Sequence, residues 1–392
     1  MSLQYPDPAP IVQPADELHA TRAPAPSPEP PVPAESRFIK WVVIGPHGLR
    51  TGWSIALFLI LTFILISLGF ALANPLEFLF FKINIEDFSP QNSVLRETIQ
   101  VLAILGAALV CARIERRRIL DYNLTGPHRL RHFFVGILGG FIALSALAFS
   151  MSLGGWLHFG PVALHGSAIL QYGAIWGLSF LLTGLAEEGS VRCYLQFTLT
   201  RGVNFWWASA LVALMCLSGL LFTNNQGVWG IDIIAALGVI PCLLLHLRKS
   251  PSAGFWQAAW LSSTFFGFIH TGNNGETWIG IFSAAAIGFV FCVSIRVTGS
   301  AWWAIGYHAS WDWAQTFFYG TADSGFQPEG HFLTTNPTGA TLFSGGTDGP
   351  EGSLLVIPVI VLTLIGILLV YRSKAPGASG ESASPAAQPQ LS

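Results

Sequence analysis

The chain carries a series of long apolar segments, and no other feature restricts its fold as strongly. A helix needs roughly 20 residues to cross a bilayer, and about ten segments reach or approach that length. They centre on residues 51–73, 94–112, 133–153, 169–197, 205–222, 231–247, 255–270, 278–295, 301–318 and 354–371. Because exposed strand edges are not tolerated in lipid, we predict an all-α, polytopic membrane helix bundle of about ten transmembrane segments.

The overall composition agrees with a membrane protein. Of 392 residues, 52% are hydrophobic and only 10% are charged, whereas soluble domains carry about 25% charged residues. The mean hydropathy is +0.55 and the formal net charge is -2. No basic run exceeds what membrane topology requires, so we expect the lipid bilayer as a partner and no nucleic acid.

The two ends of the chain differ from its middle. Residues 1–36 are rich in Pro and Ala and lack the apolar core of a signal peptide, and residues 374–392 are similar. We therefore expect two disordered tails around a transmembrane domain at 37–373. Positive charges gather before the first segment and after the second, sixth and tenth, which by the positive-inside rule predicts two cytoplasmic termini. The expected location is an integral, multi-pass membrane protein, in the cell membrane if the host is bacterial.

One apolar segment, "FLLTGLAEEGSVRCYLQF", contains three charged residues. From residue 133 to residue 186 there is no Asp, Glu, Lys or Arg, and then Glu187, Glu188 and Arg192 follow closely. Each such group costs about 2.5 to 3.5 kcal/mol near the bilayer centre, so it usually faces a polar cavity or a partner. Glu188 and Arg192 have the i, i+4 spacing of a helical ion pair. Glu187 points about 100° away and can face a cavity, unless the helix ends near Ala186 and all three charges lie at the interface.

Two further apolar segments contain histidine at helical spacing from a second notable residue. Phe266 and His270 are four residues apart in "FGFIH", and His308 and Asp312 are four apart in "HASWD". A single membrane histidine is more often a packed structural residue than a functional one. A carboxylate together with two histidines and an acid, however, supplies the base and the oxyanion donors that hydrolysis by water requires.

These three motifs resemble a known family. "EEGSVR" matches EExxxR, "FGFIH" matches FxxxH and "HASWD" matches HxxxN/D. In this order, and each on a hydrophobic helix, they resemble the CPBP family of intramembrane proteases, which includes the type II CAAX prenyl endopeptidases and Abi-like proteins. The resemblance covers a protease-like core at about 168–320, with a helix insertion at about 204–248. It implies an intramembrane endopeptidase that acts on a membrane-associated protein or peptide.

The resemblance also implies roles for single residues. Glu187 would be the general base that activates water, and His270 would assist the water or the leaving group. His308 and Asp312 would bind the carbonyl oxygen as it becomes an oxyanion. Many relatives carry Asn at the position of Asp312, and an ionised aspartate would repel an oxyanion, so this position departs from the pattern.

The remaining motif residues would have structural roles. By the same resemblance, Glu188 and Arg192 form the structural pair of the first motif, and Phe266 begins the second. In the predicted topology His270 lies near the outer end of its segment and Glu187 toward the inner end of its own. The two can meet only if one helix is broken, tilted or differently placed.

No cofactor is expected, and zinc is the alternative. Glu187, His270 and His308 could ligate zinc, with Asp312 as the fourth ligand. We favour a metal-free glutamate mechanism because no HExxH motif is present and no carboxylate partner is apparent for either histidine. Two other functions stay open. The chain could be a catalytically inactive relative that acts as a membrane scaffold, or a proton- or ion-coupled transporter, although no internal repeat of the kind common in transporters is visible.

Overall fold

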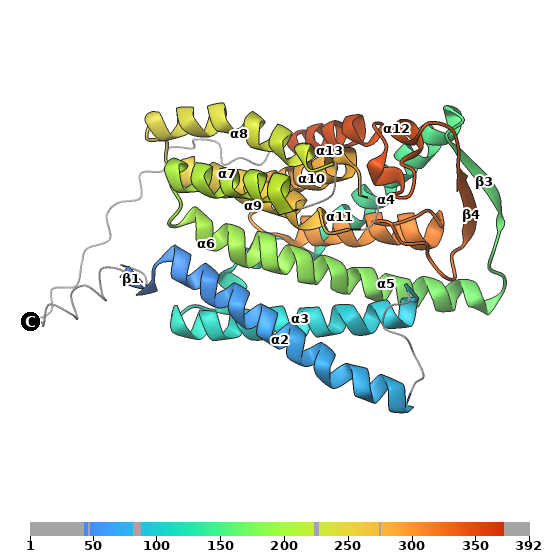
Figure 1. Ribbon diagram of the computed structural model, residues 1–392, viewed down its shortest axis with the longest axis horizontal. Helices are drawn as coiled ribbons and strands as arrows, with labels where there is room; N and C mark the ends of the chain where they lie inside the picture. Colours follow the sequence, from blue (N-terminus) through green and yellow to red (C-terminus); the bar gives the residue numbers. More distant parts are fainter. Residues whose placement is uncertain (1–42, 46–47, 81–87, 223–226, 274–275, 372–392) are drawn as a thin grey trace, which may run out of the picture.

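The computed structural model describes residues 43–45, 48–80, 88–222, 227–273 and 276–371, so both predicted tails lie outside it. The described part of the chain is mostly helical (Figure 1). The helices are α2 (Thr51–Phe80), α3 (Pro90–Ile114), α4 (Arg129–Leu153), α5 (Ser167–Glu188), α6 (Gln196–Thr200), α7 (Phe205–Phe222), α8 (Trp229–Leu247), α9 (Ala253–His270), α10 (Trp278–Thr298), α11 (Trp302–Trp313), α12 (Thr341–Ser344) and α13 (Val356–Tyr371).

Each of the ten apolar segments contains a helix, but not all of these helices are long enough to cross a membrane. Among the described residues, six helical segments have the necessary length and apolar character. They are Thr51–Ala73, Pro90–Ile114, Arg129–Leu153, Ser167–Thr200, Trp229–Leu247 and Trp278–Thr298. The prediction of about ten spans is therefore not confirmed. A segment can be apolar because it packs inside the protein. Helix α11, which continues in a π-helical turn at Ala314–Phe318, is largely buried in this way.

The helices differ in how far they are buried by their neighbours. In α10, 72% of the most apolar window is buried inside the protein, against 6% in α2. Helix α10 packs against α8, α9, α11 and α13, whereas α2 packs mainly on α3 at the edge of the bundle (Figure 1). Helix α10 is thus central, and α2 presents its apolar side chains outward, as expected of a lipid-facing helix.

Glycine residues hold α11 between α4 and α5. A Cβ atom at Gly136 or Gly140 of α4 would overlap the backbone carbonyls of Trp303 or Tyr307 in α11. A Cβ atom at Gly184 of α5 would lie 3.0 Å from the carbonyl oxygen of Ile305. Small residues allow such close backbone approach, which is how membrane helices associate when no hydrophobic drive exists between them.

Two short antiparallel strand pairs were not foreseen in the all-α prediction. Strand β1 (Ile44–Gly45) pairs with β2 (Gly48–Leu49), and β3 (Leu157–Val162) pairs with β4 (Leu333–Pro337). The second pair lies at one end of the bundle, beyond the helices (Figure 1). The pairing of β3 and β4 joins segments that are far apart in the sequence and closes that end of the structure.

Candidate active site

Helix α5 does not continue as a regular α-helix after its two glutamates. It ends at Glu188 and passes into a π-helical turn at Gly189–Leu195, before α6. A π-helix shifts hydrogen bonds from i+4 to i+5 and is frequent at functional sites. The side chain of Asn123, from another part of the chain, donates a hydrogen bond to the backbone carbonyl oxygen of Arg192 within this turn, at 2.8 Å. The charges thus lie inside a continuous 34-residue helical segment, Ser167–Thr200, and the alternative of a helix end near Ala186 is wrong.

The predicted ion pair between Glu188 and Arg192 forms and is fully buried. Nε of Arg192 lies 3.2 Å from Oε2 of Glu188, and neither side chain is exposed. The guanidinium also lies over the ring of Phe266, 4.1 Å from its centroid, and 5.6 Å from that of Phe291. Gly288 of α10 makes room for it, since a Cβ atom there would overlap Nη2 of Arg192. Phe266 therefore contacts the first motif through a cation–π interaction.

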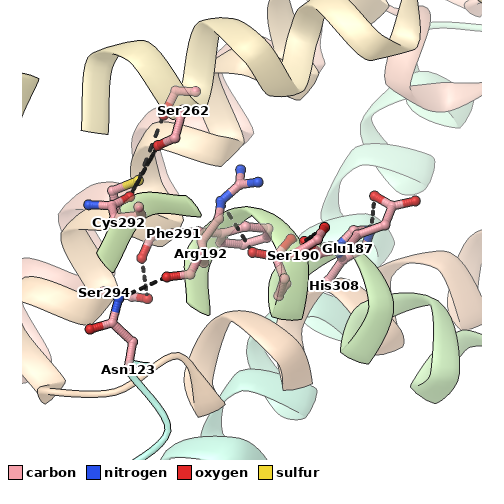
Figure 2. Close-up of polar contacts among 12 residues, drawn as sticks. Asn123, Glu187, Ser190, Arg192, Ser262, Phe291, Cys292, Ser294 and His308 are labelled. Carbon is pink, nitrogen blue, oxygen red and sulfur yellow. Dashed lines mark hydrogen bonds and ion pairs between the residues drawn. The ribbon is translucent and has the colours of Figure 1, made fainter. Parts of the chain in front are cut away.

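His308 is in contact with all three carboxyl groups of the motifs. Its Nδ1 lies 2.9 Å from Oε1 of Glu188, and its Nε2 lies 3.7 Å from Oε2 of Glu187 and 3.5 Å from Oδ2 of Asp312. Figure 2 shows His308 next to Glu187, with Ser190 and Arg192 following along the same helix. The expectation that neither histidine has a carboxylate partner is therefore wrong. Glu188 is that partner, and it fixes the orientation of the His308 ring.

His270 is oriented by the backbone. Its Nδ1 lies 2.7 Å from the carbonyl oxygen of Phe266, one helical turn earlier. A carbonyl oxygen can only accept, so Nδ1 carries the hydrogen and, in the neutral ring, Nε2 is left as an acceptor. The ring also packs edge-on against Phe266, with centroids 4.7 Å apart. His270 thus offers a basic nitrogen in a fixed position.

Two cavities meet at these residues. The larger, of about 320 Å³, is lined by Glu187, His270, His308 and Asp312. The smaller, of about 70 Å³, shares the last three of these and is otherwise largely apolar, with Ile287, Phe291, Tyr307, Trp311, Val356 and Ile360 in its wall. Glu187 and His270 therefore reach one cavity, although the predicted topology had placed them toward different ends of their segments. Glu188 and Arg192 lie behind it.

The larger cavity has acidic residues that the motifs did not include. Glu97 of α3, together with Asp323 and Glu351 from the connection before α13, lines its wall. Burial raises the pKa of Asp323 to about 6 and also raises the pKa of Glu351, although Thr316 donates to Asp323 and Ser324 to Glu351. Nothing in their sequence spacing relates these residues to Glu187, because they come from separate elements.

A second acidic contact lies beside the smaller cavity. Glu276, just before α10, forms a hydrogen bond with Asp348. Thr277 donates to the Oδ2 atom of Asp348 with both its backbone nitrogen and its hydroxyl, at 3.3 and 3.0 Å. Burial first, and then the charge of Asp348, raise the pKa of Glu276 to about 9, while burial raises that of Asp348 to about 6. Burial therefore favours the protonated form in this pair, more strongly at Glu276 than at Asp348.

Carboxylate and histidine side chains are also the residues that could hold a metal ion. Across the described ranges, no group of three or more His, Cys, Asp or Glu side chains is positioned to hold a metal ion. The side chains of Glu187, His308 and Asp312 converge, and Nδ1 of His308 is bonded to Glu188, a contact of the kind that orients a metal-ligating histidine. Both Glu187 and Asp312 approach Nε2 of His308, so they are also placed for proton transfer with it.

Part of the chain matches a known protein family. Residues 242–314 match the family described as "Type II CAAX prenyl endopeptidase Rce1-like". The stretch includes Phe266, His270, His308 and Asp312, whereas the motif that begins at Glu187 lies outside it. No curated protein and no solved structure matches the chain. The match supports the assignment of this chain to the CPBP and CAAX protease family that its three motifs indicate.

Proposed function

We propose that this protein is an intramembrane endopeptidase that hydrolyses a peptide bond near the membrane surface with water activated by Glu187. One observation carries the proposal. The Oε2 atom of Glu187 has no hydrogen-bond donor among the described residues, and the side chain lines the larger cavity. A carboxylate in this position can bind a water molecule and accept its proton.

The first step would form the bond between water and the scissile carbon. Glu187 takes a proton from the water, whose oxygen attacks the carbonyl carbon, and the negative charge moves to the carbonyl oxygen. The Nε2 atom of His308 faces the same region and, when it carries a hydrogen, donates to this oxyanion. The buried carboxylate of Glu188 at Nδ1 favours the protonated ring, in the way that a carboxylate stabilises an imidazolium in other hydrolases.

The second step would break the bond between carbon and nitrogen. The leaving nitrogen needs a proton, which Glu187 received from the water. His270 faces the cavity with an acceptor nitrogen and can orient the water or relay this proton. Asp312 would help to place the carbonyl oxygen, either as a neutral donor or through its contact with His308. The step restores the free carboxylate of Glu187.

The decisive experiment uses purified full-length protein in lipid nanodiscs with a quenched fluorescent farnesylated CAAX peptide. Glu187→Gln removes the proton acceptor but keeps shape and polarity, so turnover should fall about 100-fold or more. Glu329→Gln is the matched control, because Glu329 is exposed and lines neither cavity. Wild-type protein that binds the peptide without Glu187-dependent cleavage would favour an inactive scaffold. Proton or ion flux that depends on Glu187 would favour a transporter.

Metal dependence is tested on the same preparation. We propose that cleavage needs no metal, so EDTA or phenanthroline should leave the rate unchanged and metal analysis should find no stoichiometric zinc. Zinc present in one-to-one amount, with chelation abolishing cleavage and zinc restoring it, would contradict this. Glu187, His270 and His308 would then be assigned as its ligands.

A further inference from the structure

Helix α3 contributes a cation to the wall of the larger cavity. Arg96 lines it together with Glu187, His308 and Asp312, and no other Arg or Lys is among the described residues that do so. Helix α3 packs along α5, which carries Glu187 (Figure 1). Arg96 lies outside residues 242–314, which match the protease family, so the match assigns it no role.

The guanidinium of Arg96 has no ion-pair partner in the part of the chain that the structure describes. Within the described ranges no ion pair or hydrogen bond involves its side chain, whereas Arg117, Arg192 and Arg201 all have carboxylate partners. The charge of Arg96 acts on its neighbour Glu97, but Glu97 forms its hydrogen bond with Gln100, at 2.9 Å. The donors of Arg96 are therefore available at the cavity wall.

Five carboxyl side chains share this wall with Arg96. They belong to Glu97, Glu187, Asp312, Asp323 and Glu351. Those that are ionised repel an anion in a partly desolvated cavity. Besides His308, which the proposed mechanism uses for the oxyanion, Arg96 is the one Arg or Lys among the described residues of this wall, and a guanidinium binds a carboxylate with two parallel hydrogen bonds. Arg96 therefore offers a place for an anionic group at a fixed position relative to Glu187.

We propose that Arg96 is a specificity-determining residue that binds a carboxylate of the peptide substrate while Glu187 acts on the scissile bond. The inference rests on the proposed function. A peptide can supply the carboxylate from its C-terminus or from an Asp or Glu side chain. In both cases the position of Arg96 on α3 sets how many residues separate the carboxylate from the bond that is cut.

The test compares peptides that differ only in this group. One pair of farnesylated peptides has a free C-terminal carboxylate or a C-terminal amide, and a second pair, both amidated, has Glu or Gln as the last residue. Wild type should favour the carboxylate member of one pair by about 10- to 100-fold in KM, with kcat less affected. The pair that shows the preference identifies the source of the carboxylate.

Three variants decide whether Arg96 causes the preference. In Arg96→Gln, the two peptides of the preferred pair should have about equal KM values. Arg96→Lys should retain part of the difference in KM, because an ammonium keeps the charge but cannot form two parallel hydrogen bonds. Arg113→Gln is the matched control, since Arg113 lies on the same helix, is exposed and lines neither cavity. A ratio unchanged in Arg96→Gln, or a wild type without preference in either pair, would overturn the inference. An equal loss of cleavage of all four peptides in Arg96→Gln would likewise overturn the inference. Arg96 would then be a counter-charge for the carboxyl groups of the cavity wall.

Binding measurements keep this test separate from catalysis. The same four peptides, labelled with a fluorophore, are titrated into Glu187→Gln protein with and without Arg96→Gln, and Kd is read from anisotropy. A carboxylate preference in Kd that Arg96→Gln removes supports the inference even if no cleavage is found. Equal Kd values within both pairs overturn it even if cleavage depends on Glu187.

Discussion

Nδ1 of His308 lies 2.9 Å from Oε1 of Glu188, while Oε2 of the same carboxylate lies 3.2 Å from Nε of Arg192. One buried carboxylate thus joins a permanent cation to the histidine that faces the cavity. The two neighbouring glutamates have different tasks for this reason. Glu187 lies at the cavity and Glu188 holds the groups behind it.

Replacing Glu188 should affect stability as well as activity. Glu188→Gln leaves Arg192 buried without a counter-charge, which commonly costs about 3 to 5 kcal/mol. We expect less protein in the membrane and a lower unfolding temperature in detergent. The double variant Glu188→Leu with Arg192→Met should recover stability but not cleavage, because His308 has then lost its orienting partner. Normal stability of Glu188→Gln would mean that the pair contributes little.

Asp312→Asn tests the position at which the chain departs from many relatives. Asparagine keeps a hydrogen-bond donor beside His308 and removes a negative charge that would oppose an oxyanion. We expect activity within about 10-fold of wild type, with the greatest benefit above neutral pH, from rates measured between pH 5 and 9. A variant as inactive as Glu187→Gln would show a second essential carboxylate and would replace the proposed mechanism with a paired-acid or metal mechanism.

Gly140→Ala should displace α11. The added methyl group would overlap the carbonyl of Tyr307 and the hydroxyl of Ser310, and such overpacking costs roughly 1 to 3 kcal/mol. We expect reduced cleavage together with a lower unfolding temperature. Gly366→Ala is the control, because nothing lies within 4 Å of a Cβ atom there. Equal behaviour of the two variants would contradict the role given to the close contact of α4 and α11.

The contact of Glu276 with Asp348 predicts how stability depends on pH. The folded protein raises the pKa of Glu276 from 4.5 to about 9, so between these values it holds a proton that the unfolded chain has released. The stabilisation is fully present below pH 4.5 and is lost as the pH rises through about 9. The unfolding temperature of wild type should therefore fall as the pH rises from about 4.5 to about 9. This fall should be smaller in Glu276→Gln and unchanged in Glu329→Gln. An equal fall in the two variants would exclude Glu276 as its source.

Local pairings could be predicted from the sequence, and long-range contacts could not. Glu188 and Arg192 are one helical turn apart, so their spacing alone indicated the ion pair. The contact of Glu188 with His308 spans 120 residues and depends on the glycine packing that brings α11 to α5. Arg96, Glu276 and Asp348 were missed for the same reason, because only the folded bundle brings them near the motif residues.

Segment type was likewise easier to predict than segment length or irregular geometry. Apolar composition located the helices correctly, but it does not distinguish lipid contact from protein contact, so it could not fix the number of spans. Strands β3 and β4 contain proline and lack a regular apolar alternation, so no pattern indicated them. The π-helical turn at Gly189–Leu195 depends on tertiary support from Asn123 and leaves no clear signature in composition.

The pairing of Glu188 with Arg192 also bears on how the chain is inserted during synthesis. Both charges lie on one helical segment, so the ion pair can form as soon as that segment is helical, before α11 has been made. The translocon then receives two opposite charges that already compensate each other, in place of an isolated arginine. His308 and Asp312 follow on a later and shorter helix, which reaches a bundle where the carboxylate of Glu188 is already in place. The order of synthesis thus allows the charge of Arg192 to be neutralised by Glu188 before the later helices are made.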